Sequence, residues 1–205
     1  MRPITIILGV LLATAVSGSQ TKHRPETSDE TIWHGRYKNC DHGYLVNLPP
    51  GVVGHEGLPP MPNHGILILA ANPGTTTDVT LKEPRLIDVY DTNDAGELGS
   101  PRAYIKRYEL KPTETSERVT VLKEHSTKFR GWPATFIRLR KTNNFSTSEI
   151  EELVVYRWPK EIGPIFNIVL LRTTAEHYGE DHALYIQIRK GLEFIPVPEG
   201  ECSND

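Results

Sequence analysis

The sequence predicts an α+β fold in which a central, mostly antiparallel sheet is covered on both faces, as in a three-layer α/β/α sandwich. From residue 43 onward, short apolar runs alternate with Gly, Pro, Asn and Asp, a pattern typical of strands and turns. Two later runs, residues 150–158 and 164–172, carry apolar side chains at both alternating sets of positions. A strand of this kind must be covered on both faces.

Seven strands are expected in chain order. They are the apolar runs at residues 44–48, 65–71, 86–90, 118–123, 132–140, 150–158 and 164–172. Because successive strands joined by short links usually become neighbours, the later runs should pair as an antiparallel meander.

The first expected helix is recognised by its start. Ser100 is a good N-cap residue, and Pro101 suits the first helical position, where its missing N–H has no partner to lose. Tyr104, Ile105 and Tyr108 then fall on one face. The spacing predicts a helix that runs to about residue 110.

The second expected helix precedes Gly191. Thr173 and Glu176 have the spacing of a capping box, in which each side chain caps the other's backbone N–H. Apolar residues recur at helical intervals before Gly191, a residue type that commonly ends helices. Gly179 within this stretch leaves the first residue of the helix open.

The N-terminus has the features of an export signal. Arg2 precedes an uncharged apolar run at residues 4–16, which small residues follow up to Gly18. Thirteen apolar residues are too few to span a bilayer comfortably as a helix. We therefore expect a signal peptide at 1–18, cleaved near Gly18, a secreted or periplasmic protein, and no membrane span in the mature chain.

The rest of the chain suits one domain. Residues 19–39 are polar and are expected to form a leader, in which Trp33 and Tyr37 are the side chains able to dock onto the domain. Residues 40–202 supply the core. The division predicted is therefore a signal peptide, a polar leader and a single α+β domain.

Export makes Cys40 and Cys202, the two cysteines of the chain, a natural disulfide pair. They bracket nearly the whole domain, so a bond between them is worth roughly 5 kcal/mol in the chain-entropy model. The alternative is two free thiols near the ends of the domain. Neither cysteine has the sequence context of a catalytic nucleophile.

The segment between residues 54 and 65 carries the candidate metal ligands. Imidazole and carboxylate groups suit zinc, and His55, Glu56 and His64 supply them. The helical zinc motif, however, needs two histidines four residues apart, and this segment is interrupted by prolines. A metal-dependent exported enzyme is therefore an alternative to the favoured function, and no cofactor is expected.

The order of several motifs resembles that of the PsbP/Mog1-like group of α/β/α sandwich domains, which includes small secreted bacterial proteins. The motifs are GYLVNLP at 43–49, GWPA at 131–134, LRTTAEHY at 171–178 and GLEFIP at 191–196. The resemblance covers roughly residues 43–196 and implies a domain that binds partners or assists assembly. It brings no active-site residue to this chain, and residues 54–65 do not match the group's pattern.

Composition and motifs favour a non-enzymatic role. With 23 Lys and Arg against 26 Asp and Glu, the net charge is −3, which argues against a nucleic-acid partner. The sequence has neither a nucleophile elbow nor a phosphate-binding loop. We expect an exported domain that binds a protein partner, either through Leu58 and Met61 in the proline-rich loop or through a sheet face. A small-ligand carrier is a third possibility, which requires an apolar cavity.

Overall fold

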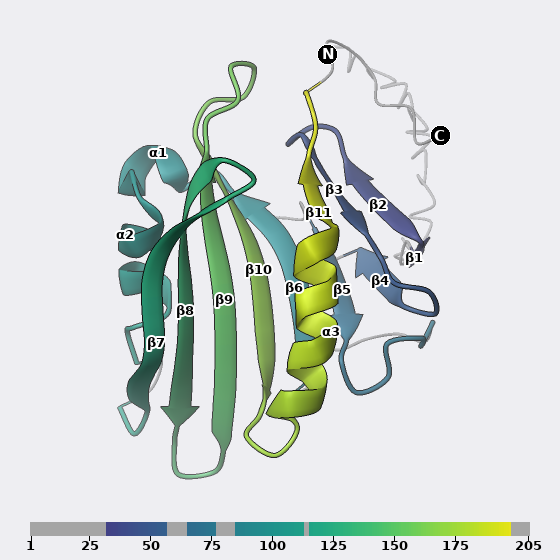
Figure 1. Ribbon diagram of the computed structural model, residues 1–205. Helices are drawn as coiled ribbons and strands as arrows, with labels where there is room; N and C mark the ends of the chain where they lie inside the picture. The colour runs from purple at the N-terminus through teal and green to yellow at the C-terminus, as the bar shows by residue number, and fades with distance from the viewer. Residues whose placement is uncertain (1–31, 57–64, 77–84, 113–114, 198–205) are drawn as a thin grey trace, which may run out of the picture.

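The computed structural model describes residues 32–56, 65–76, 85–112 and 115–197. An eight-stranded sheet has the order β1-β4-β5-β6-β10-β9-β8-β7, and a three-stranded sheet has the order β11-β3-β2 (Figure 1). The strands are β1 (Ile32–His34), β2 (Arg36–Asn39), β3 (Tyr44–Asn47), β4 (Val53–Glu56), β5 (Ile66–Leu69), β6 (Leu86–Thr92), β7 (Arg118–Phe129), β8 (Trp132–Thr142), β9 (Thr147–Arg157), β10 (Ile165–Thr174) and β11 (Leu192–Phe194). The helices are α1 (Ala95–Leu98), α2 (Pro101–Tyr108) and α3 (Tyr178–Gly191).

Every strand pair among the described residues is antiparallel, and β7 to β10 form the expected meander. Each of the seven expected strands is present. The largest difference is β7, which was expected to end at Lys123 and continues to Phe129. Because nearly all of this strand is exposed, its second half carries no alternation of apolar residues to reveal it.

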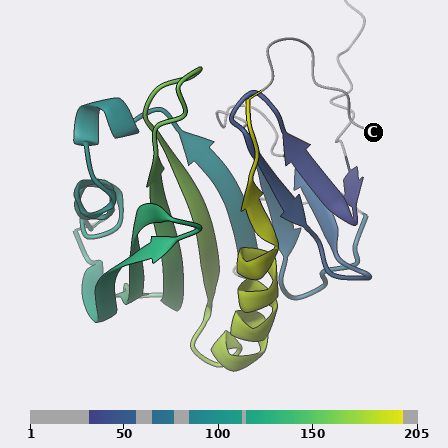
Figure 2. The same cartoon turned by 45° about the horizontal axis from the view of Figure 1, so that its top comes forward.

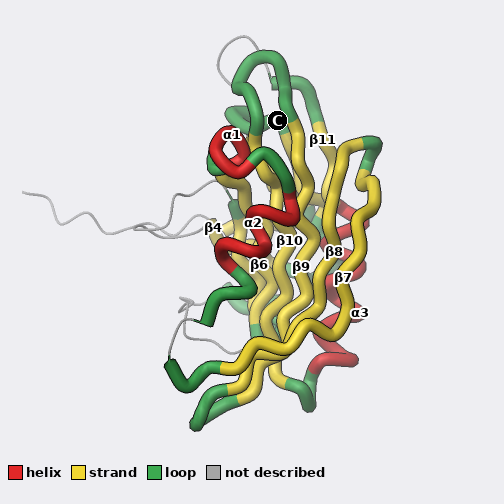
Figure 3. Tube along the Cα trace, turned by 90° about the vertical axis from the view of Figure 1, so that its left-hand side faces the viewer, coloured by secondary structure: helices red, strands yellow, loops and turns green. Residues whose placement is uncertain are grey.

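The helices lie on the two faces of the large sheet, with α1 and α2 on one side and α3 on the other (Figure 3). The α3 face is shared with the three-stranded sheet, because Tyr44 and Val46 of β3 pack in the same core as Ile188 of α3 and Leu171 of β10. The expected three-layer α/β/α arrangement is therefore not confirmed. The sheet is large, the helices are few, and a second sheet covers part of one face.

Strand β10 shows why both faces need cover. Val169 and Leu171 belong to the core under α3, whereas Ile168 and Leu170 belong to the core under α2. Successive side chains of a strand point to opposite faces, so this one apolar run contributes to both cores.

The start of α2 was predicted correctly. The Ser100 hydroxyl accepts a hydrogen bond from the backbone N–H of Ala103 at 3.2 Å, and Pro101 is the first helical residue. Helix α3, whose first residue the sequence left open, does not begin at the capping box. Its N-cap is His177, while Thr173 lies in β10 and donates a hydrogen bond to the carboxylate of Asp181. The strand continues past the capping-box residue because its side chain has this partner within the fold.

Part of the segment expected to be a polar leader is folded. Strands β1 and β2 lie in it, Tyr37 is buried, and the Trp33 ring meets the Tyr37 ring edge-on at 5.2 Å between centroids. These two aromatic residues dock onto the domain. The predicted signal peptide at residues 1–18 lies outside the described residues.

Arg157 at the end of β9 joins the large sheet to the turn before β3. Its buried guanidinium donates hydrogen bonds to Asn167 Oδ1 at 2.5 Å and to the carbonyl of Gly43 at 3.1 Å, and it lies 4.2 Å from the centre of the Phe194 ring. Burial lowers the pKa of Arg157 to about 10, which leaves it charged at neutral pH. These contacts anchor the small sheet on the large one.

Candidate functional site

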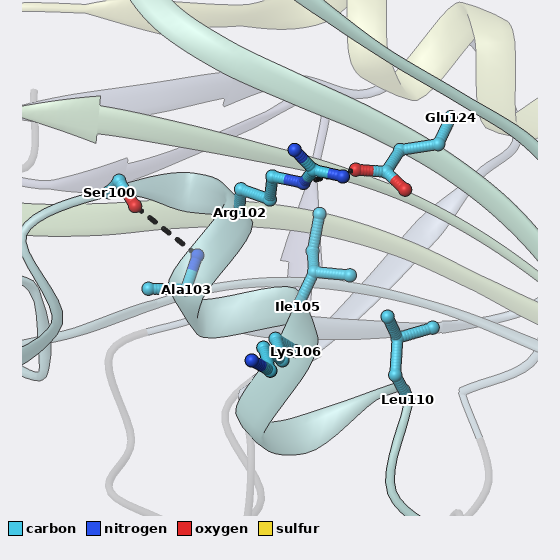
Figure 4. A pocket seen from close by; sticks show the side chains of 7 residues that line it. All are labelled: Ser100, Arg102, Ala103, Ile105, Lys106, Leu110 and Glu124. Carbon is cyan, nitrogen blue, oxygen red and sulfur yellow. Dashed lines mark hydrogen bonds and ion pairs between the residues drawn. The ribbon is translucent and has the colours of Figure 1, made fainter.

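A cavity of about 490 Å³ lies between α2 and the edge strand β7 (Figure 4). It is lined by Ser100, Arg102, Ala103, Ile105, Lys106, Leu110 and Glu124. Ile105 and Leu110 point toward the sheet and give the cavity an apolar wall, and Ile105 is fully buried. Arg102 Nε contacts Glu124 Oε1 at 3.1 Å, so an ion pair connects the helix to the strand.

The polar groups of the cavity already have partners in part. The Ser100 hydroxyl accepts the capping hydrogen bond of α2, and Glu124 contacts Arg102. An apolar wall with Arg102, Lys106 and Glu124 around it suits an apolar side chain of a partner held among charged groups.

Two large apolar side chains of β7 are exposed within three residues of Glu124. Val121 and Leu122 are 44% and 41% exposed. A bulge between Val121 and Lys123 interrupts the pairing of β7 with β8. We call these two residues, together with the cavity lining, the α2–β7 surface.

Two cations of this region have no ion-pair partner among the described residues. Arg102 pairs with Glu124, and Arg107 pairs with Glu97. Lys106 in the cavity lining and Lys128 of β7, in contrast, have no ion-pair partner in the part of the chain that the structure describes.

Two acidic side chains lie on the α2 face of the sheet. Asp88 and Glu152 are both cross-strand partners of Leu170, one on each side of it. Glu152 is fully buried, and neither of its carboxylate oxygens has a hydrogen-bond partner. Burial raises the pKa of Asp88 to about 7. Burial, with a smaller contribution from Glu109, raises the pKa of Glu152 well above its ordinary value.

A second polar cluster lies under the first turns of α3. The buried Glu151 accepts a hydrogen bond from the Tyr178 hydroxyl and lies 3.3 Å from His182 Nε2, and the Arg138 guanidinium stacks 3.5 Å above the Tyr178 ring. These residues come from β8, β9 and α3. Their charges satisfy one another, so the cluster holds α3 on the sheet.

Of the predicted metal ligands, His55 and Glu56 lie in the described residues and point to opposite faces of β4. His55 lies buried in β4, where its Nε2 is 3.0 Å from the carbonyl of Thr75. Glu56 is the next residue of that strand, so its side chain points to the opposite face. His64, and the expected partner-binding residues Leu58 and Met61, lie outside the described residues. Metal binding by this segment stays a prediction.

Only one of the two cysteines of the predicted disulfide lies in the described residues. Cys40 follows β2 and is 5% exposed. Cys202 lies outside the described residues, so the pairing of the two stays a prediction.

The α2–β7 surface was not predicted from the sequence. Its two sides, residues 100–110 and Glu124, are separated by a segment with no recognisable motif, and the second half of β7, which contains Glu124, lacks apolar periodicity. The one local signal was the Ser100–Pro101 helix start, which placed α2 but not its neighbour.

No family model and no curated protein sequence matches the chain. Solved structures do match. Cyanobacterial PsbP (CyanoP) from Synechocystis shares 12% identity, with 80% of this chain and 92% of that chain covered at a TM-score of 0.52. LpqN of Mycobacterium tuberculosis shares 12% identity, with 82% and 94% covered at a TM-score of 0.52.

The fold is PsbP/Mog1-like. This confirms the resemblance inferred from the motif order. The Ran-binding protein Mog1p of Saccharomyces cerevisiae also matches, at 12% identity over 81% of this chain and 97% of that chain, with a TM-score of 0.48. The assignment rests on the first two structures, and at 12% identity they establish the PsbP/Mog1-like fold alone. Within the described ranges, no helix has the length and apolar character needed to cross a membrane.

Proposed function

We propose that this chain is an exported, non-enzymatic domain that binds another protein through the α2–β7 surface. The observation that carries the proposal is the cavity of about 490 Å³, which combines an apolar wall with a charged rim. Protein interfaces commonly have this composition, with an apolar centre surrounded by polar groups.

The exposed apolar side chains beside the cavity support the same surface. Val121 and Leu122 are among the few large apolar residues that the described part of the chain leaves exposed. Grouped apolar side chains on a surface commonly mark a contact with a partner. They extend the contact area along β7 beyond the cavity itself.

The charge of Lys106 favours an acidic group on the partner. Lys106 lines the cavity and has no ion-pair partner among the described residues, and charge complementarity speeds encounter and selects partners. Export is supported by the signal-like N-terminus. LpqN, which has the same fold, is described as involved in cell envelope biogenesis.

Site-specific crosslinking tests this proposal. A photo-reactive residue is placed at Lys106 in the purified protein, which is then irradiated with the exported fraction of the source organism. A matched variant carries the same group at Lys160, an exposed lysine in the turn between β9 and β10. We expect a discrete product from position 106 that is absent from position 160.

The substitution Ala103→Trp, which fills the cavity, should abolish that product while circular dichroism shows an unchanged fold. Products that are equal at the two positions, or that persist after the cavity is filled, would overturn the assignment of this surface.

The metal-dependent enzyme is the alternative that the sequence raised. Metal analysis of the purified protein decides it, with the double variant His55→Ala/His64→Ala as control. Zinc bound at one equivalent and lost in the double variant would favour the alternative. If neither protein binds zinc, the metal-dependent enzyme is excluded and the binding function is favoured.

A further inference from the structure

The second half of β7 is an open strand edge with defined ends. Residues 123–129 pair with residues 132–138 of β8 in continuous register. The bulge at Leu122 bounds this segment on one side, and the turn at Arg130, whose φ is 52°, bounds it on the other. No strand in the described part of the chain pairs with the outer edge of β7.

We propose that this edge pairs with the same edge of a second copy of the chain, so that two eight-stranded sheets join across a twofold axis at Ser126. The other end of the large sheet is β1, a strand of only three residues. The long edge is therefore the one able to support an extended contact between sheets.

Symmetry restricts the register of such a pair. Residues that face each other in an antiparallel pair lie on the same face of the sheet, so at the twofold axis one residue must face its own copy. Ser126 is the middle of the segment 123–129. Pairing centred on Ser126 gives every residue of the segment a partner, and it sets the bulge at Leu122 opposite the turn at Arg130 of the second copy.

This register also pairs opposite charges. Glu124 faces Lys128 of the second copy, and symmetry repeats the pair on the other side of Ser126. Opposite charges directly across neighbouring strands are stabilising, and like charges there are destabilising. Lys128 has no ion-pair partner among the described residues, and Glu124 has a second oxygen besides the one that Arg102 contacts.

The charges favour a second copy over an unrelated strand. Lysines on an edge usually discourage pairing with other sheets, and Lys123 and Lys128 have that effect on any strand lacking matched acids. The chain itself supplies the matched acid, at Glu124. Because the twofold axis is perpendicular to the joined sheet, both α2–β7 surfaces lie on the same side of the dimer.

Sedimentation equilibrium of the purified protein over concentrations from about 1 to about 200 µM tests the proposal. We expect a concentration-dependent monomer–dimer equilibrium. Glu124→Lys or Lys128→Glu alone sets like charges opposite each other and should raise the dissociation constant at least about tenfold. The double reversal Glu124→Lys/Lys128→Glu restores the pairing and should return it to within about threefold of the original.

Two controls separate the interface from other effects. Glu124→Lys also removes the contact with Arg102, so Arg102→Ala should dimerise like the unchanged protein. Lys160→Glu changes the charge away from the edge and should leave the equilibrium as it was. A protein that is monomeric throughout the range, or a double reversal no better than the single ones, would overturn the proposal.

A cysteine scan reads the register directly. Ser126 faces its own copy, so Ser126→Cys should form an intermolecular disulfide under mild oxidation, seen as a dimer on a non-reducing gel. Thr127→Cys, which faces His125 of the second copy, should not. Equal crosslinking at the two positions would contradict the register. Because the crosslinking proposed above uses a different protein as partner, either result can fail without the other.

Discussion

Arg130 in the turn between β7 and β8 is tied to Lys190 near the end of α3: its Nη2 donates a hydrogen bond to the Lys190 carbonyl at 2.8 Å. Its Nε donates to the carbonyl of Leu192 at 3.3 Å. The guanidinium thus caps carbonyls that the end of a helix leaves without partners, and its charge suits the negative end of the helix dipole. Figure 2 shows the end of β7 turned toward α3 and β11.

Arg130→Ala should destabilise the protein by about 1–3 kcal/mol, because it removes both hydrogen bonds and a charge at the end of α3. Arg130→Gly loses the same contacts but relieves a positive φ, which costs a residue with a side chain about 1 kcal/mol. The glycine variant should therefore be the more stable of the two in urea unfolding. An alanine variant as stable as the unchanged protein would show that the contact contributes nothing.

Glu152→Gln should stabilise the protein at neutral pH and leave it unchanged near pH 4. The pKa of Glu152 in the folded protein lies well above its ordinary value of 4.5, so above about pH 4.5 the unfolded chain releases a proton that the folded one retains. Stability then falls as pH rises toward the folded pKa, by about 1.4 kcal/mol per pH unit at most. Glutamine cannot ionise and avoids this loss.

Urea unfolding between pH 4 and pH 8 measures the effect, and we expect Glu152→Gln to gain about 1–3 kcal/mol at pH 7.5. Asp88→Asn is the companion variant. Since the pKa of Asp88 is raised to about 7 by burial, its contribution should level off near neutral pH. If the free energy of unfolding varied with pH in the same way for Glu152→Gln and the unchanged protein, Glu152 would not be the cause of the loss of stability at higher pH.

Two glycines of α3 should respond in opposite ways to alanine. A Cβ at Gly191 would lie 2.2 Å from the backbone oxygen of Asn47, so the helix must move away from β3. We expect Gly191→Ala to cost about 2–4 kcal/mol. Gly179 has no atom within 4 Å of an added Cβ, and Gly179→Ala should gain roughly 0.5 kcal/mol from helix propensity. Thermal unfolding of the pair distinguishes close packing from propensity.

If Cys40 and Cys202 are paired, Cys40→Ser, Cys202→Ser and the double variant each break the same bond. The free energy of unfolding should therefore fall by the same amount in all three, about 5 kcal/mol in the chain-entropy model. Under denaturing, non-reducing conditions the unchanged protein should react with no thiol reagent. Two reactive thiols, or losses that add in the double variant, would show that no bond forms.

The elements predicted well are those whose determinants are local. Ser100 and Pro101 mark the start of α2 because an N-cap acts within three residues. Runs of apolar residues at both alternating sets of positions revealed β9 and β10, because burial on two faces leaves this pattern in each strand. Thr173 misled for the opposite reason, since its partner Asp181 becomes available only when α3 folds back onto β10.

The sequence by itself determined the class of the fold, the antiparallel meander and the resemblance to the PsbP/Mog1-like group, because patterns of burial and capping are written in neighbouring residues. Tertiary structure alone decided that Glu124 meets Arg102 beside a cavity, that Glu152 is buried without a partner, and that β7 is an open edge. These contacts depend on strand order and register, which bring together residues whose separation along the chain carries no periodic signal.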